Sequence, residues 1–568
     1  MVKRFITTRS NSVLSAAMIM AVVGLGSRLL GVLRERLLSA RFGVGPEMDA
    51  YAAAFRIPDT LFALFVVGAI ATAFIPVLAD ALFGKNAADS QNPPLLNTRP
   101  EALNIAVSIL NSITLVIGIL AIGAFFLAPQ LVGLIAPGFD YERHDLTVVL
   151  LRLMLLQPII LGASTVIGAV LQTYRHFVAF ALAPVFYNLG IILGLVILVP
   201  LLGVLGLAWG VLFGAVLHLL VQLPALKATQ FKWQPLWRWT AAEAKILKLM
   251  IPRTIGIAGE NLSLLVLTAL ASTMAQGTNA LLYYADNIRA LPMGIIGVAF
   301  SVAAFPLLSA KAAQANLKDF STSLMASVRQ VLFWVIPLTV ALYLLRAHLV
   351  RLVIGTHQLT WDPTILAIAM VGAFTFTIIF QALVPLLAKA FYAFKNTWLP
   401  VTAAIFGSGL TAGSAFWFAA ELKARLPWTL ILADILRVPQ MPDLTPLALP
   451  LALGAGVVLQ VIILVTALKI KLAKIDGIWT FFQSIIKTIT ATVAMAIALY
   501  LTRNFLAPLA TDPDLRTTVG LFFQASFAAI AGAAAFVLVS WGLESKELQE
   551  LKRILPWTKK SIDPAQEK

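Results

Sequence analysis

The chain has 568 residues, of which 60% are hydrophobic and only 12% are charged, and its formal net charge is +16. A soluble domain carries about 25% charged residues, and no compact soluble fold hides this much apolar surface. The composition therefore excludes a soluble enzyme, a disordered chain and a fibrous repeat. Because the apolar runs are long and continuous, it predicts an all-α polytopic membrane protein rather than a β-barrel.

Fourteen apolar segments are candidate membrane spans. They cover residues 13–40, 50–82, 103–128, 146–172, 177–200, 203–226, 246–275, 279–309, 325–346, 364–393, 398–420, 446–469, 479–502 and 517–542. The first, second and eighth carry several charges, so hydropathy alone would score the first two poorly. The short run 129–136 and the half-apolar loop 421–444 are expected to lie at the membrane interface.

Lys and Arg gather in every second loop, whereas the alternate loops are richer in Asp and Glu. This asymmetry predicts that both termini lie in the cytoplasm. A basic linker separates two sets of six spans, an arrangement typical of transporters. The expected organisation is an N-lobe 1–226, a cytoplasmic amphipathic linker 227–245, a C-lobe 246–470, two further helices 471–545 and a cytoplasmic tail 546–568.

Charges inside spans are costly and usually face a cavity or a partner, so their positions mark the candidate site. In the first span, Arg28 and Glu35 are seven residues apart and fall within about 20° of one helical stripe, with Arg34 about 100° away from Glu35. Asp49 and Arg56 repeat this spacing at the second span. The alternative for each is an ion pair that only locks helix packing. Arg36 and Arg41, near the outer end, are expected to snorkel.

The seventh and eighth segments carry further charges, namely Arg253, Glu260, Asp286 and Arg289, and Arg152 stands alone in the fourth. Arginine forks match phosphate oxygens, so this set indicates an anionic substrate with phosphates, with structural ion pairing as the open alternative. The chain has no cysteine, its five histidines are scattered, and no catalytic or nucleotide-binding motif occurs. We therefore expect no enzyme activity, no metal and no cofactor.

Several motifs, with their spacing, resemble the MurJ/MviN family of lipid II flippases. The resemblance runs in order over roughly residues 13–470. It rests on the stretches SRLLGVLRERLLSARFG, DAYAAAFRIPD, GAIATAFIPVLAD, APGF, LAPVFYNLGII, LLYYADNIRALPMGIIGVAFSVAAFPLLS and AKAFYAFKNTWLP. The family belongs to the multidrug/oligosaccharidyl-lipid/polysaccharide exporter superfamily.

The resemblance implies about fourteen helices, with two six-helix lobes in a V shape plus two C-terminal helices, and a cationic central cavity. It implies that lipid II, the undecaprenyl-pyrophosphate-linked peptidoglycan precursor, crosses from the inner to the outer leaflet of the bacterial cytoplasmic membrane. Arg28 and Arg34 match the family's essential arginines, Glu35 and Asp49 match acidic positions, and Arg56 matches a basic one. The expected partners are this anionic lipid-linked precursor, membrane lipids and the cell-wall synthesis machinery, for a monomer that binds no nucleic acid.

This sequence departs from the family pattern at three places. Phe62, Ala63 and Val67 stand where charged residues are common, and Asn287 follows YYAD where the family has an essential arginine. The span 398–420 has no acid for the sodium site of some members. Our hypothesis is that Arg289 or Arg253 supplies the missing cation of the second lobe.

Three other functions stay open at this point. The first is export of another lipid-linked oligosaccharide or polysaccharide, or of a drug. A membrane-embedded glycan ligase or polymerase is the second, and it would need catalytic residues in its outer loops. The third is a scaffold without transport, in which the arginines of the cavity could be neutralised without effect.

Overall fold

The computed structural model describes most of the chain. The described residues are 13–67, 74–83, 100–229, 231–237, 240–295, 297–314, 316–472, 478–507 and 518–554. Helices joined by short connections make up this part, and no strand occurs in it, which confirms the all-α prediction. Within the described residues, ten helices are long and apolar enough to cross a membrane, and shorter apolar helices accompany them. The count of fourteen spans stays a prediction.

The chain divides into two compact units, Met1–Leu281 with Thr356–Leu359, and Leu282–Gly355 with Thr360–Lys568. The two units are groups of residues that contact one another more than they contact the rest of the chain, whereas the predicted lobes are sets of six consecutive membrane spans. The predicted lobe, linker and tail boundaries therefore stay a prediction.

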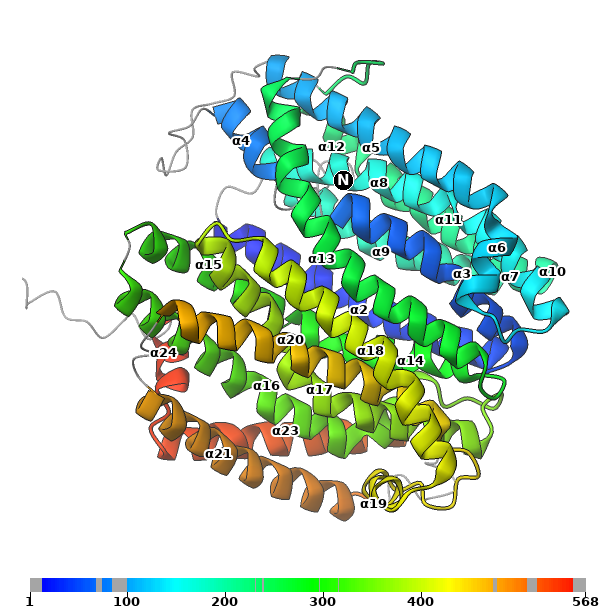
Figure 1. Cartoon of the computed structure of the whole chain (residues 1–568), viewed down its shortest axis with the longest axis vertical. Coiled ribbons are helices and arrows are strands. Elements are labelled where there is room, and N and C mark those ends of the chain that lie inside the picture. Colours follow the sequence, from blue (N-terminus) through cyan, green and yellow to red (C-terminus); the bar gives the residue numbers. More distant parts are fainter. Residues whose placement is uncertain are drawn as a thin grey trace, which may run out of the picture. The chain divides into compact units, whose positions relative to one another are not determined.

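The described helices of the first unit run from the first predicted span to the seventh (Figure 1). They are α2 (Val13–Phe42), α3 (Pro46–Phe62), the π-helix η1 (Ala63–Val67), α4 (Ile75–Phe83), α5 (Pro100–Phe126), α6 (Ala128–Ile135), α7 (Tyr141–Met154), α8 (Leu156–Thr173), α9 (Phe177–Leu193), the π-helix η4 (Gly194–Leu198), α10 (Val199–Leu202), α11 (Val204–Leu220), α12 (Leu223–Lys227) and α13 (Ala241–Ser272). α3 begins with Pro46, whose missing N–H costs nothing in a first turn.

Glycines set the distance between α9 and α11. A Cβ atom added to Gly190 would lie 2.3 Å from the Cα atom of Gly214, so the two backbones touch where side chains would normally separate them. Small residues permit such close helix packing within membranes. α2 packs against another part of α9. This packing brings the charged stripe of the first span against a helix of the fifth.

The described helices of the second unit begin with α14, whose first turn still belongs to the first unit. They are α14 (Thr278–Ile295), α15 (Gly297–Ala313), α16 (Leu317–Val353), α17 (Trp361–Ala393), α18 (Trp398–Ala424), α19 (Pro427–Leu436), the 3-10 turn η5 (Thr445–Leu447), α20 (Ala448–Leu472), α21 (Ile478–Phe505), α23 (Thr518–Gly542) and α24 (Lys546–Ile554). α18 packs on α20, and α17 packs on α15, α16 and α20.

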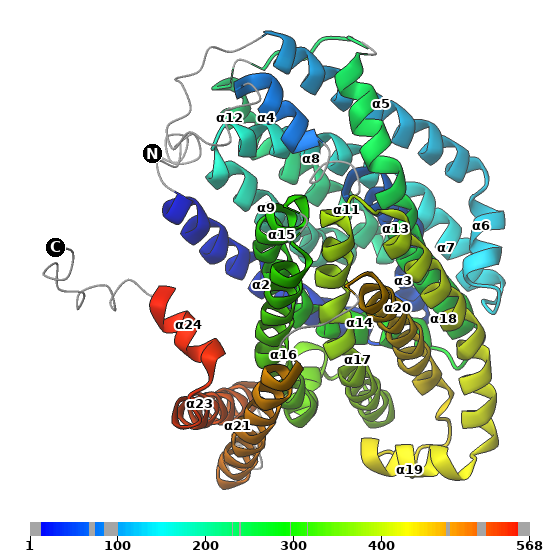
Figure 2. The ribbon, with the colours of Figure 1, turned by 60° about the vertical axis from the view of Figure 1, so that its left-hand side comes forward.

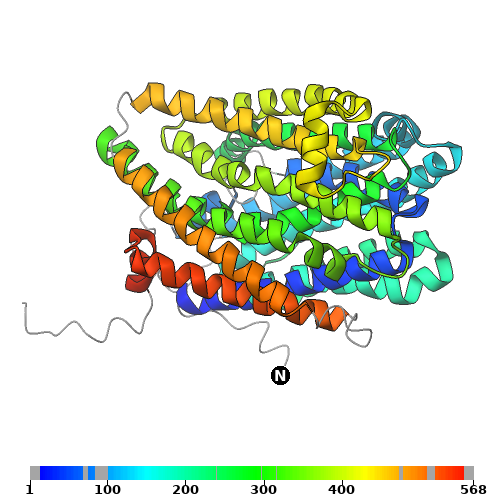
Figure 3. The same cartoon turned by 90° about the horizontal axis from the view of Figure 1, so that it is seen from below.

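The last two long helices, α21 and α23, pack against each other and against α16 (Figures 1 and 3). The short helix α24 joins them through Glu547, which accepts a hydrogen bond from Ser484 at 2.7 Å and pairs with Arg329 at 3.4 Å. Glu547 is buried, so these two contacts compensate for the removal of its carboxylate from water. The C-terminal helices are thus tied to α16 by both apolar and polar contacts.

Two connections differ in character from the spans. Residues 231–237, in the middle of the predicted amphipathic linker, form no helix and are held by Asn111 of α5, which donates to the carbonyls of Gln234 and Leu236 at 2.8 and 3.0 Å. The loop 421–444 contains α19, which lies across the ends of neighbouring helices of its unit rather than along them (Figure 2).

Candidate functional site

The first cluster of predicted site residues lies between α2 and α9. Arg34 donates from Nε to Glu35 at 3.2 Å and from Nη1 to the side-chain oxygen of Asn188 at 3.0 Å. Asn188 donates in turn to the carbonyls of Ser27 and Pro184. The planar guanidinium is therefore held in one orientation by an acid and an amide, which is the preorganisation that recognition of a phosphate needs.

The sequence spacing placed Glu35 on the stripe of Arg28, whereas the structure pairs it with Arg34, its neighbour in the chain. Both side chains are long enough to bridge the angle between adjacent helical positions. Arg28 is half-buried two turns earlier on α2, Arg36 is half-buried, and Arg41 is exposed. Arg28 and Arg34 thus share one helix, and their predicted joint role in binding stays a prediction.

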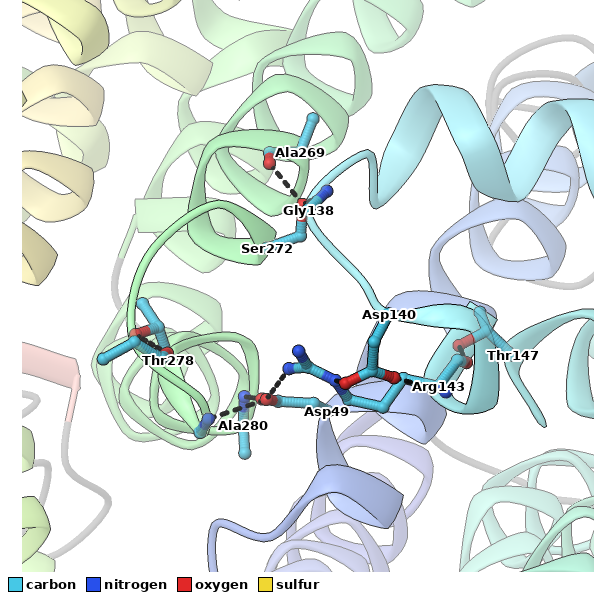
Figure 4. Close-up of polar contacts among 11 residues, drawn as sticks. Asp49, Gly138, Asp140, Arg143, Thr147, Ala269, Ser272, Thr278 and Ala280 are labelled. Atoms are coloured by element: carbon cyan, nitrogen blue, oxygen red, sulfur yellow. Dashed lines mark hydrogen bonds and ion pairs between the residues drawn. The ribbon is translucent and has the colours of Figure 1, made fainter. Parts of the chain in front are cut away.

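The second cluster surrounds Asp49, in the first turn of α3. Its carboxylate is almost fully buried and accepts the backbone N–H of Gly277 at 2.6 Å and that of Ala280 at 2.9 Å (Figure 4). Arg143 lies on the other side, with Nη1 3.8 Å from Oδ2 of Asp49. Because Gly277 directly precedes α14, Asp49 satisfies N–H groups that the start of this helix leaves without an intrahelical partner. A negative charge is also favoured at this end of the helix dipole.

The loop between α6 and α7 supports Arg143. Asp140 caps α7 by accepting the backbone N–H of Arg143 at 2.9 Å, and its other oxygen accepts from Nε of Arg143 at 3.0 Å. The backbone hydrogen bond above all, together with the guanidinium, holds the pKa of the exposed Asp140 carboxyl below its usual value. In the same loop Gly138 donates its N–H to Ser272, at the end of α13, at 3.1 Å (Figure 4).

Arg56 takes a different partner from the one that its spacing to Asp49 indicated. Its Nε donates to the hydroxyl of Thr268 on α13 at 3.1 Å. Asp49 pairs with Arg143 instead. The two residues of α3 therefore contact different partners, and no ion pair joins them in the described part of the chain.

The predicted charges of the second half lie on α13 and α14. Arg289 pairs with Asp286 one turn earlier, donating from Nε at 3.0 Å, and its guanidinium lies 5.1 Å from the ring centre of Phe374 on α17. Its charge is therefore balanced by an acid of its own helix. Asn287, which lies between Asp286 and Arg289 in the sequence, is half-buried. The side chains of Arg253 and Glu260 lie outside the described part, so which arginine replaces the family's cation stays a hypothesis.

The sequence did not indicate three residues that complete these clusters. Asn188 lies within the quoted stretch LAPVFYNLGII, and an amide inside an otherwise apolar span was the signal that could have found it. Arg143 and Ser272 carry no such signal, because their roles depend on contacts with residues more than ninety positions away. Arg152, by contrast, donates to the carbonyl of Phe125 at 3.2 Å and lies over its ring, which favours the structural alternative for this arginine.

The geometry of these clusters suits binding and the positioning of helices. Arg34 presents a fixed cation, and Asp49 and Arg143 tie α3, α7 and the start of α14 together. In the described part, no group of three or more His, Asp or Glu side chains is placed to hold a metal ion.

Comparisons with known proteins agree with the resemblance of the sequence. The family model described as "Lipid II flippase MurJ" matches residues 38–512. The chain is 31% identical to a "Probable lipid II flippase MurJ" of Rhizobium tropici over 386 residues, covering 66% of this chain and 70% of that protein. It is 29% identical to the "Lipid II flippase MurJ" of Burkholderia cenocepacia over 390 residues, covering 67% and 73%.

The fold also occurs in solved structures. One is "Lipid II flippase MurJ, inward closed conformation", with a TM-score of 0.67, 21% identity, and coverage of 94% of this chain and 100% of the other. The second is an inward-facing multidrug resistance MATE family transporter of the MOP superfamily, with a TM-score of 0.59, 14% identity, and coverage of 80% and 98%. At these identities, the structural likeness concerns the fold alone.

Proposed function

The chain belongs to the lipid II flippase MurJ family, and from that premise we propose that it moves lipid II from the inner to the outer leaflet of the bacterial cytoplasmic membrane. The observation that carries the proposal is the cluster of Arg34, Glu35 and Asn188, in which a guanidinium is fixed inside a predicted membrane-spanning region. A pyrophosphate offers the oxygens that such a fork binds.

Glu35 has a defined part in this proposal. An arginine inside the membrane is costly when it has no counter-charge, and Glu35 supplies one while no substrate is bound. The arriving pyrophosphate then competes with Glu35 for the same guanidinium. The affinity for substrate is thereby limited, which favours release on the outer side over permanent capture.

Transport would proceed by alternating access. Enclosing the sugar and peptide head lowers the cost of moving it across roughly 30 Å of hydrocarbon, while the lipid tail stays in the bilayer. A second cation, supplied by Arg289 or Arg253, would also bind the pyrophosphate. For Arg289, this requires the substrate to compete with Asp286, as it competes with Glu35 at Arg34.

The finer assignments follow from the charge pattern and the family. We place both termini in the cytoplasm, since the basic loops then face inward. The substrate is the pyrophosphate-linked precursor. The protein acts as a monomer, and its partners are membrane lipids and the cell-wall synthesis machinery. The energy comes from an ion gradient, the membrane potential or mass action.

The test compares Arg34→Gln and Arg34→Lys with Arg41→Gln, which removes an exposed arginine from the same helix. In cells depleted of their own lipid II flippase, we expect growth with the wild type and Arg41→Gln, none with Arg34→Gln, and weak growth with Arg34→Lys, because lysine is a point charge without the fork. Translocation of lipid II into the outer leaflet of vesicles should follow the same order. Growth with Arg34→Gln at the wild-type rate would contradict the role of this residue, and failure of the wild type would favour another exported lipid or a drug.

A further inference from the structure

Three arginines lie near one another at the α19 end of the second unit. Arg346 belongs to α16, Arg437 follows α19 directly, and Arg503 lies near the end of α21. The positive charges of Arg437 and Arg503 both act on Arg346. In the part of the chain that the structure describes, none of the three forms an ion pair. The group therefore carries an uncompensated positive charge.

Arg346 is the buried member of this group, with 8% of its surface exposed. Nη1 donates to the carbonyl of Tyr343 at 2.7 Å, and the guanidinium lies 4.0 Å from the ring centre of the same tyrosine. Nε is buried and has no hydrogen-bond partner. Within the described residues, the partners of this buried guanidinium are the carbonyl and the ring of Tyr343, and neither carries a charge, so a bound anion would stabilise the arginine.

The surroundings of Arg346 form a fixed frame. A Cβ atom added to Gly372 of α17 would lie 3.1 Å from Nε of Arg346, so α17 packs directly against it. The hydroxyl of Tyr343 donates to the carbonyl of Ile435 at 2.8 Å and ties α16 to α19. Arg503 donates from Nη1 to the carbonyl of Leu344 at 3.3 Å, which ties α21 to α16. Contacts between helices thus hold Arg346 and Arg503, and Arg437 directly follows α19.

The helix α19, which lies beside these arginines, has an exposed apolar side. Ala433 and Leu436 are buried within the unit, whereas Leu430, Ile431 and Ile435 are 43–61% exposed. The helix lies across the ends of its neighbours (Figure 2). A short helix with an uncovered apolar side in this orientation is typical of a helix lying in the membrane interface. Phosphate headgroups occupy that depth, and arginine binds them through charge-assisted hydrogen bonds.

We propose that Arg346, Arg437 and Arg503 bind the phosphate of an anionic membrane lipid at the α19 end of the second unit. Arg437 and Arg503 attract the headgroup from the interface, and Arg346 supplies the desolvated charge that the phosphate compensates. A bound lipid holds α16, α19 and α21 together through a single headgroup. The pyrophosphate of the transported lipid has the same chemistry, so the experiment must separate the two sources.

The experiment uses the full chain purified in detergent and measures retained phosphatidylglycerol by native mass spectrometry, with phosphatidylcholine for comparison. We expect Arg437→Gln with Arg503→Gln to lower the affinity for phosphatidylglycerol at least fivefold and to leave the weak binding of phosphatidylcholine unchanged. The control, Lys423→Gln with Lys469→Gln, removes two exposed charges from the same unit and should bind as the wild type does. Arg346→Gln should show the largest loss, and the double variant keeps the test valid if this buried substitution prevents folding.

Two competition experiments distinguish a membrane lipid from the transported lipid as the molecule bound at the three arginines. Inorganic pyrophosphate should compete poorly, because the interface contributes the lipid's remaining contacts. Undecaprenyl pyrophosphate should compete no better than phosphatidylglycerol. The proposal is overturned if the Arg437 and Arg503 variant retains phosphatidylglycerol as the wild type does, if inorganic pyrophosphate displaces the lipid at equal concentration, or if undecaprenyl pyrophosphate displaces it at a tenth of that concentration.

Discussion

The carboxylate of Asp49 accepts the backbone N–H of Gly277 at 2.6 Å, across 228 positions of sequence. A side chain of α3 therefore closes the start of α14, a task that usually falls to a residue of the helix's own N-terminus. Gly277 has a φ of +90°, and a Cβ atom there would lie 2.6 Å from the carbonyl oxygen of Val44. The close approach thus needs a glycine on one side and a short acid on the other.

The substitution Asp49→Asn keeps the size of this side chain but leaves it one acceptor oxygen for two N–H donors. The amide's own N–H₂ then faces either Gly277 or Ala280, and one buried donor loses its partner, at a cost of roughly 1–3 kcal/mol. We expect a lower unfolding temperature and at least tenfold slower lipid II translocation. Glu47→Gln, on the exposed side of the same first turn, is the control and should change neither quantity. Wild-type stability in Asp49→Asn would show that the cap contributes nothing.

Composition was sufficient to predict the all-α membrane fold, because 60% hydrophobic residues in long runs leave helices as the main solution. The position of Asp49 beside a predicted span also marked it as a residue that needs a partner. The partners of Asp49 could not be predicted from the sequence, because only the packing of distant helices brings Arg143, Gly277 and Ala280 to it. Spacing along one helix also paired Arg28 with Glu35 and Asp49 with Arg56, whereas contacts with α9, α13 and α14 decide where these side chains turn.

Residues 231–237 and α19 show how far the local sequence determines the conformation of the connections. Residues 231–237, which belong to the predicted amphipathic linker, form no helix, as Pro235 in their middle favours, and Asn111 of α5 donates to the carbonyls of Gln234 and Leu236. The linker and its boundaries stay a prediction. The start of α19 agrees with its local sequence, since Pro427 is favourable at the first position of a helix, whereas its end at the left-handed Arg437 carries no such signal.

The stretch APGF contains a glycine, Gly138, whose replacement we expect to be disruptive. A Cβ atom on Gly138 would lie 2.3 Å from the carbonyl oxygen of Ser272, so Gly138→Ala must push the loop away from α13 and break the hydrogen bond to the Ser272 hydroxyl. Overpacking of this kind costs about 1–3 kcal/mol. We expect a lower unfolding temperature and impaired complementation. Gly133→Ala, on α6, meets no atom within 4 Å and should retain wild-type stability and growth, so equal loss in both variants would rule out this explanation.

Asp140 gives a prediction on pH. Its folded pKa is lowered because it accepts hydrogen bonds from Arg143, so its contribution to stability is present above the unfolded pKa of about 3.9 and is lost as the pH falls through the folded value. Asp140→Asn still caps α7 but does not titrate. The unfolding temperature of the wild type should therefore exceed that of Asp140→Asn at pH 7, and the difference should shrink towards pH 3. The effect is small because the carboxyl is exposed, and a difference that stays constant between pH 7 and pH 3 would contradict it.

Asn188 tests whether Arg34 needs a fixed orientation or only a charge. Its amide oxygen accepts from Arg34, and its N–H₂ group anchors it to the carbonyls of Ser27 and Pro184. Asn188→Ala keeps the positive charge of Arg34 but removes the amide that holds its guanidinium in one orientation. We therefore expect the lipid II concentration at half-maximal translocation to rise about tenfold, with a smaller change in the maximal rate. Asn188→Asp has the same size and adds a second carboxylate beside Arg34, which competes with pyrophosphate, so its affinity should fall further than that of the alanine variant. If both variants lowered only the maximal rate and the unfolding temperature, Asn188 would have a purely structural role, and equal affinities in all three proteins would remove it from the binding site.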